Sequence, residues 1–444
     1  AQEAGGARAR PARPPLSGAS GARTGGWEAP QPMSARLAAY TAYTLSPAQK
    51  RVKEEGEAGK YGKAPPHCVV TGGNGFVGQR LVEMLVERGA QKVVSFDVVR
   101  ASENVWKHPA IKYVTGDLRD LAAVEAAIKG ADCVWHNGAA VGPYHPQELY
   151  HAVNVVGTAN VISACQKHGV TKLVFSSSPS TRFGPTSATD PDGATEEEMP
   201  SLPQATYVQE YAKTKAEAEL LVREACSEGL LTIAVAPHQV YGPRDNLFLP
   251  NILEVSGLGK LRVFGPGRNR ICFTHVDNYA HALILGEKVL TPGHPALGKF
   301  YIATDGDTHP HPEGYCVFWE HIDSVITDMG FKPIRGKCHL PAWLMMFVGW
   351  LCQTVGGWFG LKPKLTCFSV RMLLMNRWFR ISAIERDLGY RPVIGFREGW
   401  ADTVCWFREH WLPHFGSGAS GLTGGVAKQT QHKIDLQSGV KKVD

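Results

Sequence analysis

Two residues of the chain, Tyr211 and Lys215, have the types and the spacing needed for proton transfer. They lie four positions apart, so a helix would place them on one face, one turn from each other. A neighbouring ammonium favours the phenolate form of a tyrosine and lowers its pKa from about 10. Such a tyrosine can accept the proton of an alcohol while hydride leaves for a nicotinamide ring. The same spacing also occurs in solvated pairs on amphipathic helices, so the pair needs support from its context.

Three consecutive serines, Ser176, Ser177 and Ser178, give part of that context. They follow the apolar run Leu173-Val174-Phe175, which reads as a strand buried on both faces. A hydroxyl at the carboxyl end of such a strand can hydrogen-bond the oxygen that reacts. The serine-tipped strand comes before the Tyr211–Lys215 pair in the chain, and this order favours a catalytic interpretation of both.

A glycine-rich loop earlier in the chain predicts the cofactor. Gly72, Gly75 and Gly78 follow an apolar strand pattern and open a helical pattern that starts at Phe76. Glycines let the backbone approach a pyrophosphate, and the unpaired N–H groups of a helix start face its charge. Asp97 closes the next strand, where a carboxylate would meet ribose hydroxyls. We therefore expect a dinucleotide site.

Strand and helix patterns alternate between about residues 64 and 240. The predicted strands are 67–71, 92–97, 112–115, 132–136, 171–176 and 232–236, and the predicted helices are 76–89, 119–129, 147–168 and 209–229. Most of the strands are continuous apolar runs, which is typical of a parallel sheet covered on both faces. The predicted fold is α/β, a Rossmann-type doubly wound parallel sheet over 64–240, with a smaller C-terminal α/β substrate-binding part over 241–415.

Composition narrows the function classes. The 444 residues carry a net charge of +6, much of it near the ends, which gives little support for a nucleic-acid partner. The ten cysteines lie singly without a C-x-x-C pair, and the histidines lack ligand spacing, so neither a disulfide framework nor a metal site is expected. Residues 1–63 are predicted to be disordered, with an organelle-targeting role as the alternative, and 416–444 to be a disordered tail.

A series of short motifs extends from about Cys68 to Phe407. In chain order they are T-G-G-N-G-F-V-G at 71–78, G-D-L at 116–118, N-G-A-A at 137–140, N-V-V-G-T at 154–158, S-S-S at 176–178, Tyr211 with Lys215, and L-G-Y-R-P at 388–392. Together they resemble the extended short-chain dehydrogenase/reductases, in the 3β-hydroxysteroid dehydrogenase group. Within that group, P-H-Q-V-Y-G-P-R-D at 237–245 and F-T-H-V-D-N at 273–278 are most similar to the decarboxylating sterol-4α-carboxylate 3-dehydrogenases.

The resemblance implies a role for each site residue. Tyr211 would accept the proton, Lys215 would hold the nicotinamide ribose, and Ser178 would orient the substrate oxygen, with Ser177 as the alternative. Asp97 would hold the adenosine ribose and so favour NAD, although Arg100 nearby keeps NADP open. The other implied cofactor contacts are Gly72, Gly75, Phe76, Val77 and Gly78 at the pyrophosphate, Asp117 and Leu118 beside the adenine, Ala139 along the cofactor, and Pro237 in the nicotinamide pocket.

One departure from the wider family points to the substrate. Sugar-nucleotide members carry an arginine that clamps a diphosphate, where this chain has Ile271, followed by Cys272. Arg270 is one residue out of register. The expected reaction is therefore oxidation of the 3β-hydroxyl of a sterol, as a 4α-carboxysterol that loses carbon dioxide. A 3β-hydroxysteroid dehydrogenase/isomerase, a sugar-nucleotide epimerase or dehydratase, and a non-catalytic dinucleotide-binding protein are the alternatives.

Residues 342–361 carry no charge over twenty positions, which is about the length that crosses a hydrocarbon core. Three interpretations stay open: a monotopic or re-entrant membrane anchor, which we favour, a core helix pair, or a full span. The resemblance implies association with the endoplasmic reticulum membrane, with the active site facing the cytoplasm. A homodimer is the other partner considered.

Overall fold

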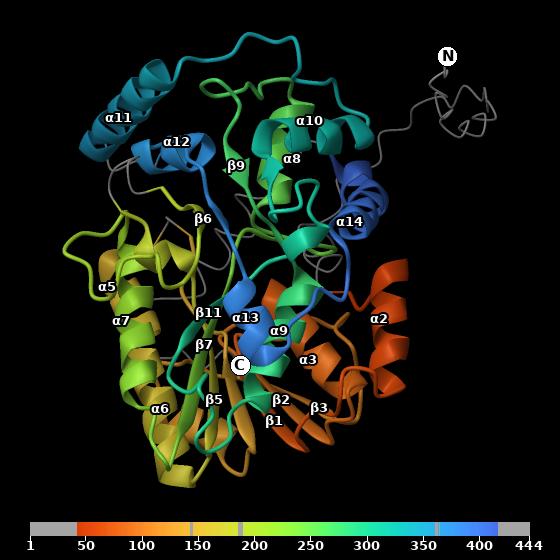
Figure 1. Ribbon diagram of the computed structural model, residues 1–444, viewed down its shortest axis with the longest axis vertical. Helices are drawn as coiled ribbons and strands as arrows, with labels where there is room; N and C mark the ends of the chain where they lie inside the picture. Colours follow the sequence, from red (N-terminus) through yellow and green to blue (C-terminus); the bar gives the residue numbers. More distant parts are fainter. Residues whose placement is uncertain (1–41, 143–144, 185–189, 360–362, 364, 416–444) are drawn as a thin grey trace, which may run out of the picture.

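A parallel seven-stranded sheet forms the centre of the computed structural model (Figure 1), which describes residues 42–142, 145–184, 190–359, 363 and 365–415. Its strand order is β11-β7-β5-β4-β1-β2-β3, so the order reverses between β1 and β4. In open α/β sheets, ligands bind at such a switch point, outside the carboxyl ends of the strands. The strands are β1 (His67–Thr71), β2 (Lys92–Asp97), β3 (Ile111–Thr115), β4 (Cys133–His136), β5 (Lys172–Ser176), β7 (Leu231–Pro237) and β11 (Phe300–Ala303).

Helices cover both faces of this sheet, which confirms the predicted doubly wound fold. One face is covered by α3 (Phe76–Glu87) and α9 (Val276–Lys288), with α2 (Pro47–Glu57) and α13 (Ser382–Leu388) packed against them. The other face is covered by α4 (Leu121–Ile128), α6 (Gly157–His168) and α7 (Glu210–Glu224), and α5 (Gln147–Tyr150) leads into α6 through a π-helical turn, His151–Val156.

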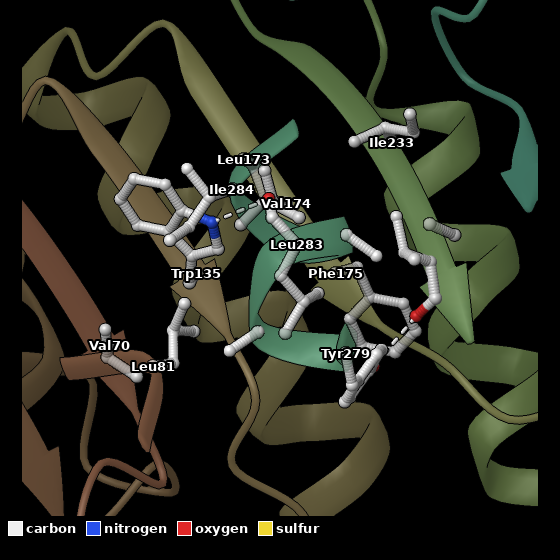
Figure 2. Packing of buried hydrophobic residues seen from close by; sticks show 14 of the residues in the cluster. Val70, Leu81, Trp135, Leu173, Val174, Phe175, Ile233, Tyr279, Leu283 and Ile284 are labelled. Carbon is white, nitrogen blue, oxygen red and sulfur yellow. Dashed lines mark hydrogen bonds between the residues drawn. The ribbon is translucent and has the colours of Figure 1, made fainter. Parts of the chain in front are cut away.

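The core lies between the sheet and these helices (Figure 2). Val70, Leu173, Val174 and Ile233 are fully buried on the central strands, as their continuous apolar runs predict. The Trp135 indole on β4 crosses to α9, where its N–H donates to the Leu283 carbonyl oxygen at 3.0 Å. This bond satisfies a polar group that is otherwise buried in apolar surroundings, and it fixes α9 over the sheet.

The C-terminal part is built from short paired strands and helices, and a second apolar core fills it. Tyr241 stacks on Trp400 in this core, with ring centroids 4.1 Å apart. The strand pairs are β8 (Val240–Tyr241) with β10 (Thr274–His275), β9 (Arg270–Ile271) with β12 (Cys316–Val317), and β6 (Asp192–Ala194) with β13 (Trp378–Phe379). The helices are α8 (Leu249–Gly257), α10 (Phe318–Asp328), α11 (Ala342–Trp358), α12 (Cys367–Leu374) and α14 (Phe396–His410).

The sheet does not end at residue 240, where the sequence placed the end of the Rossmann domain. Strand β11 pairs with β7 in parallel, and α9 packs on the sheet, although both come later in the chain. The boundary was misplaced because Phe300–Ala303 is a four-residue apolar run with no alternation, which sequence alone does not assign to a strand or a helix.

Part of the segment predicted to be disordered is helical. Helix α2 starts with a capping box between Ser46 and Gln49. The Ala48 N–H donates to Asp402 of α14 at 2.8 Å, and the Gln49 amide donates to Asp277 of α9 at 2.7 Å. The prediction for 1–63 is therefore wrong for the helix. Residues 1–41 and 416–444 lie outside the described residues.

Most of the uncharged stretch, Ala342–Trp358, forms α11, which packs along α12 at the end of the molecule farthest from the sheet (Figure 1). Residues 360 and 361 of the stretch lie outside the described residues. Its aromatic side chains face outward, with Trp343 72% and Trp358 79% exposed. The core-helix interpretation is therefore wrong. None of the helices in the described ranges is long and apolar enough to cross a membrane. The other large apolar residues of this stretch that are exposed are Phe347, Trp350, Leu351, Val355 and Phe359.

Candidate active site

The glycine loop has the close packing that only glycine allows. Gly72 adopts a φ of +66°, and a Cβ there would lie 2.7 Å from the Cα of Gly138. A Cβ on Gly78 would lie 2.0 Å from the carbonyl oxygen of Gly72. Gly75 is the N-cap of α3 and offers no side-chain cap, so the first N–H groups of the helix, at Phe76 and Val77, stay available to a phosphate. The loop therefore fits a dinucleotide.

Asp97 ends β2 beside this loop. Its carboxylate accepts the N–H of Asn74 at 3.0 Å and the N–H of Val99 at 2.8 Å. Burial raises the pKa of Asp97, and these backbone N–H groups oppose that shift. Each oxygen keeps a second lone pair, so the carboxylate can still accept ribose hydroxyls.

The residues expected beside the adenine and along the cofactor follow β3 and β4. Asp117 is held by Arg119 through contacts of 2.6–3.0 Å, so its carboxylate is already engaged. Leu118 is buried, and its side chain approaches Gly138 and Gly157 closely. Ala139 is half-buried at the end of β4. All three lie at the same carboxyl edge of the sheet as Gly72 and Asp97.

Tyr211 and Lys215 lie one turn apart near the start of α7. The Lys215 ammonium donates to the carbonyl oxygen of Ser176 at 2.6 Å and sits 4.0 Å from the centre of the Phe175 ring. Burial lowers the pKa of Lys215 to about 7, and the Glu219 carboxylate opposes that shift. The two side chains of α7 thus contact the end of β5 and the residues after it, Lys215 at Ser176 and Tyr211 at Ser178.

The pKa of Tyr211 differs from the value that the sequence led us to expect. Burial raises the pKa of Tyr211 to about 12, and the Ser178 hydroxyl, through a side-chain hydrogen bond, opposes this rise. The lysine is engaged with the Ser176 carbonyl oxygen, so its direct contact is with the backbone. The pKa of Tyr211 is therefore raised in the structure, where the sequence predicted that Lys215 would lower it. A cationic nicotinamide ring beside the phenol would act in the lowering direction.

The two candidate serines have different surroundings. The Ser177 hydroxyl is buried and donates to Glu219 at 2.7 Å. The Ser178 hydroxyl caps the 3₁₀ turn Pro179–Arg182, lies 2.8 Å from the Ser180 hydroxyl and interacts with Tyr211. Of the two serines, only Ser178 has a hydroxyl that interacts with Tyr211.

A buried arginine that the sequence did not single out, Arg377, lies near the carboxyl end of β7. Pro237 ends β7, and His238 after it packs against the Phe379 ring of β13, with centroids 5.2 Å apart. Arg377, two positions before Phe379, is only 7% exposed. It donates to the Gln239 side chain at 3.1 Å, and its Nε has no partner among the described residues.

No carboxylate in the described part of the chain forms an ion pair with Arg377, and burial lowers its pKa to about 10. Buried charges are normally paired, because transfer of an unpaired charge from water is costly. Three other buried arginines follow that rule: Arg80 pairs with Glu87 and Asp277, Arg182 with Glu219, and Arg244 with Glu83. Arg88, which is 2% exposed and bonds to Met84 and His281, is a second buried arginine that forms no ion pair with a described carboxylate. Arg377 is thus a cation able to receive an anion. Nothing in its local sequence indicates this, since the residues around it come from β7, β9 and β13.

Three comparisons relate this geometry to known proteins. Residues 69–333 match the 3-beta hydroxysteroid dehydrogenase/isomerase family. The chain is 34% identical over 333 residues to 2-alkyl-3-oxoalkanoate reductase of Stenotrophomonas maltophilia (strain K279a), covering 74% of this chain and 96% of the relative. It is 30% identical to the decarboxylating sterol-4-alpha-carboxylate 3-dehydrogenase of Mus musculus, covering 76% and 90%. An epimerase of Methanothermobacter thermautotrophicus shares the fold, with a TM-score of 0.59 and 21% identity over 82% of this chain and 97% of that one.

Proposed function

The chain belongs to the 3-beta hydroxysteroid dehydrogenase/isomerase family and is an NAD(P)-dependent oxidoreductase, and we propose that it oxidises the 3β-hydroxyl of a 4α-carboxysterol, with loss of carbon dioxide. The names of the bacterial and mouse relatives describe substrates with one feature in common. In both, a carboxylate is attached to the carbon next to the one that is oxidised or reduced. A substrate of this kind presents an alcohol or ketone and an anion side by side.

Arg377 is the observation that carries this proposal. A neutral 3β-hydroxysteroid would leave a buried guanidinium without a counter-ion, whereas a carboxylate beside the reacting hydroxyl would supply one. The Gln239 carbonyl oxygen already accepts from Arg377, so its amide N–H groups are directed elsewhere and can bind the second carboxylate oxygen. Gln239 also has a φ of +45°, a backbone conformation that costs energy for a non-glycine residue and is common at ligand sites.

Each catalytic residue has a defined task in the oxidation. Tyr211 accepts the hydroxyl proton, Ser178 donates a hydrogen bond to the same oxygen, and Lys215 binds the nicotinamide ribose. The nicotinamide, when bound, supplies the acceptor for the hydride that leaves C3. Gly72, Gly75 and Asp97 hold the dinucleotide at the switch point, and Pro237 forms the wall of the nicotinamide pocket.

Loss of carbon dioxide needs no additional residue. The oxidation product is a β-keto acid, so the C4–carboxyl bond can break with its electron pair moving to the C3 oxygen. The resulting enolate then takes a proton at C4. Ser178 and Tyr211, which we assign to that oxygen, would stabilise the negative charge as it develops.

The substrate-side residues disfavour a sugar nucleotide. Ile271 is fully buried where sugar-nucleotide enzymes place a diphosphate-binding arginine. Arg270 next to it is ion-paired with Asp192 and lies over the Tyr315 ring. A diphosphate therefore lacks a free cation at this position.

The test is to incubate purified protein with NAD and a 4α-carboxysterol and to measure NADH and carbon dioxide together. We expect the two products in a one-to-one ratio. Turnover of a 3β-hydroxysteroid without the carboxylate at an equal kcat/KM would favour the dehydrogenase/isomerase alternative. Turnover of UDP-glucose would favour the epimerase alternative, and reduction of a 2-alkyl-3-oxoalkanoate, with no sterol oxidation, would identify the acyclic acid as the substrate.

We also propose that α11 lies on the surface of the endoplasmic reticulum membrane, with the active site on the cytoplasmic side. Trp343, Phe347, Trp350 and Trp358 are all more than half exposed on one helix, and a large exposed apolar patch marks an interaction site. A sterol substrate partitions into the same bilayer. Flotation with phosphatidylcholine vesicles tests the idea: replacing Trp343, Trp350 and Trp358 with serine should abolish flotation and leave NAD binding unchanged. Flotation that persists in the triple variant would contradict it.

A further inference from the structure

A buried ion pair, Glu219 with Arg182, lies directly behind the catalytic residues and has no role in the chemistry described above. Glu219 is fully buried on α7, and Arg182 is 5% exposed at the end of the turn Pro179–Arg182. Both guanidinium ends of Arg182 donate to the Glu219 carboxylate, one of them at 3.0 Å. Arg182 also lies 3.6 Å from the centre of the Phe300 ring on β11. The pair thus joins a helix, a turn and a strand.

The same carboxylate holds both ends of the segment that carries Ser178. At the start of the segment the Ser177 hydroxyl donates to Glu219 at 2.7 Å, and at its end Arg182 is ion-paired to Glu219. Ser178 lies between them as the cap of the turn, and its hydroxyl interacts with Tyr211. Glu219 therefore ties the segment that carries Ser178 to α7, the helix that carries Tyr211.

Glu219 also acts on Lys215, which lies four positions earlier on the same face of α7. Among the described residues, the groups packed around Lys215 are uncharged or belong to this pair. From β5 it meets the Phe175 ring and the Ser176 carbonyl oxygen. His136 of β4 is neutral, because burial lowers its pKa to about 3. Tyr211 precedes Lys215 by one turn, and its phenol is neutral because burial raises its pKa to about 12. The nearest charges are thus Glu219 and, behind it, two cations that contact its carboxylate: Arg182, and Arg223 at 3.7 Å, which is more exposed.

We propose that Glu219 and Arg182 form a positioning pair for the oxidation: the pair holds the Ser178 hydroxyl against Tyr211, and the Glu219 charge keeps Lys215 an ammonium. The inference rests on the proposed function, since it assigns roles around the same tyrosine, serine and lysine. The two partners of the pair act on Lys215 with opposite sign. Removing the Glu219 charge removes an attraction for the ammonium, whereas removing Arg182 leaves the Glu219 charge less neutralised.

The test uses three variants of the full chain: Glu219→Gln, Arg182→Met and, as a matched control, Glu217→Gln. Glu217 lies on the same helix, is partly exposed and pairs only weakly with Lys213, 4.0 Å away. The pH dependence of NAD binding is measured without sterol, and the pH profile of kcat is measured with 4α-carboxysterol. The first readout follows Lys215 even if the sterol is not a substrate, so failure of the proposed function appears separately, as normal NAD binding without turnover.

Glu219→Gln should move the alkaline loss of NAD binding and of kcat to lower pH by about one unit, and Arg182→Met should move both to higher pH. Both variants should lower kcat about 10- to 100-fold at the optimum, because Ser178 is no longer held in place. Glu217→Gln should match the wild type. Shifts in the same direction for both variants, or no shift in Glu219→Gln, would overturn the proposal. The Glu219→Gln result alone decides if Arg182→Met does not yield folded protein.

Discussion

Replacing Arg377 with methionine is the most direct test of the substrate. The change removes the buried positive charge and keeps a side chain of similar length and apolar volume. In the ligand-free protein it also removes a charge that has no acidic partner among the described residues. We therefore expect the thermal stability of Arg377→Met to equal or exceed that of the wild type, because burying an unpaired charge is unfavourable.

The effect on catalysis follows from the bonds that the guanidinium can make. It donates one hydrogen bond to Gln239, and no described residue is a partner of its Nε. A hydrogen bond to a charged group contributes about 1.5–3 kcal/mol, which corresponds to a factor of about 10–150 in affinity. We expect the KM for a 4α-carboxysterol to rise by that factor. The kcat/KM for the same sterol without its carboxylate should stay within about twofold, because that substrate makes no bond to Arg377.

The assay compares the two sterols with saturating NAD in the wild type, Arg377→Met and Arg270→Met. Arg270 is the matched control, since its backbone oxygen accepts the N–H of Arg377 and its own side chain is occupied by Asp192. Arg270→Met should keep the wild-type preference for the acid. An equal loss on both sterols in Arg377→Met would refute the reasoning, and so would a wild type that shows no preference for the carboxylated sterol.

Three further predictions concern the cofactor side and stability. Tyr211→Phe should lower kcat at least about 100-fold with NAD binding retained, measured by NADH formation and by fluorescence titration, because the proton acceptor is lost; full activity would refute the assignment. Asp97→Asn should weaken NAD and improve NADP use, seen as a fall in the ratio of their kcat/KM values, because the 2′-phosphate no longer meets a carboxylate; an unchanged ratio would contradict it. Burial lowers the pKa of His136 to about 3 and of His309 to about 4, against about 6.5 in the unfolded chain. The stability that these neutral histidines contribute is therefore present above pH 6.5 and is lost as the pH falls, by about 2 kcal/mol each at pH 5. The measurement is urea unfolding at pH 7 and pH 5, and equal free energies of unfolding at the two pH values would contradict the prediction.

Strands and helices were predictable where the local pattern of apolar residues matches the burial of that segment in the folded protein. Strands such as Lys172–Ser176 are buried on both faces, so their composition alone identifies them. Helix α2 was missed because most of its side chains are charged and its stability comes from single contacts, such as that of Gln49 with Asp277 of α9. Contacts between segments far apart in the chain leave no local signal.

The residues of the site likewise fall into two groups: those that local spacing relates, and those that only folding brings together. Tyr211 and Lys215 share one helix, so their spacing is enough to relate them. Glu219 continues that spacing by one more turn and could have been noticed, but its partner Arg182 lies in a turn that sequence spacing does not relate to α7. Arg377 had no signal at all, since only folding brings β13 beside the end of β7. The substrate end of the site is therefore the part that required the structure.

Arg377 and the hydroxyl pair of Ser178 and Tyr211 would act on different steps of the reaction. A guanidinium that binds the carboxylate stabilises the substrate and the β-keto acid, but this stabilisation fades as the negative charge leaves the carboxylate. The charge then develops on the C3 oxygen, to which we assign Ser178 and Tyr211. Arg377 would thus favour binding and oxidation, and the hydroxyl pair would favour loss of carbon dioxide. On this reasoning Arg377→Met forms NADH more slowly at low substrate and still releases one carbon dioxide per NADH, because the step after oxidation depends on the oxygen and not on the arginine.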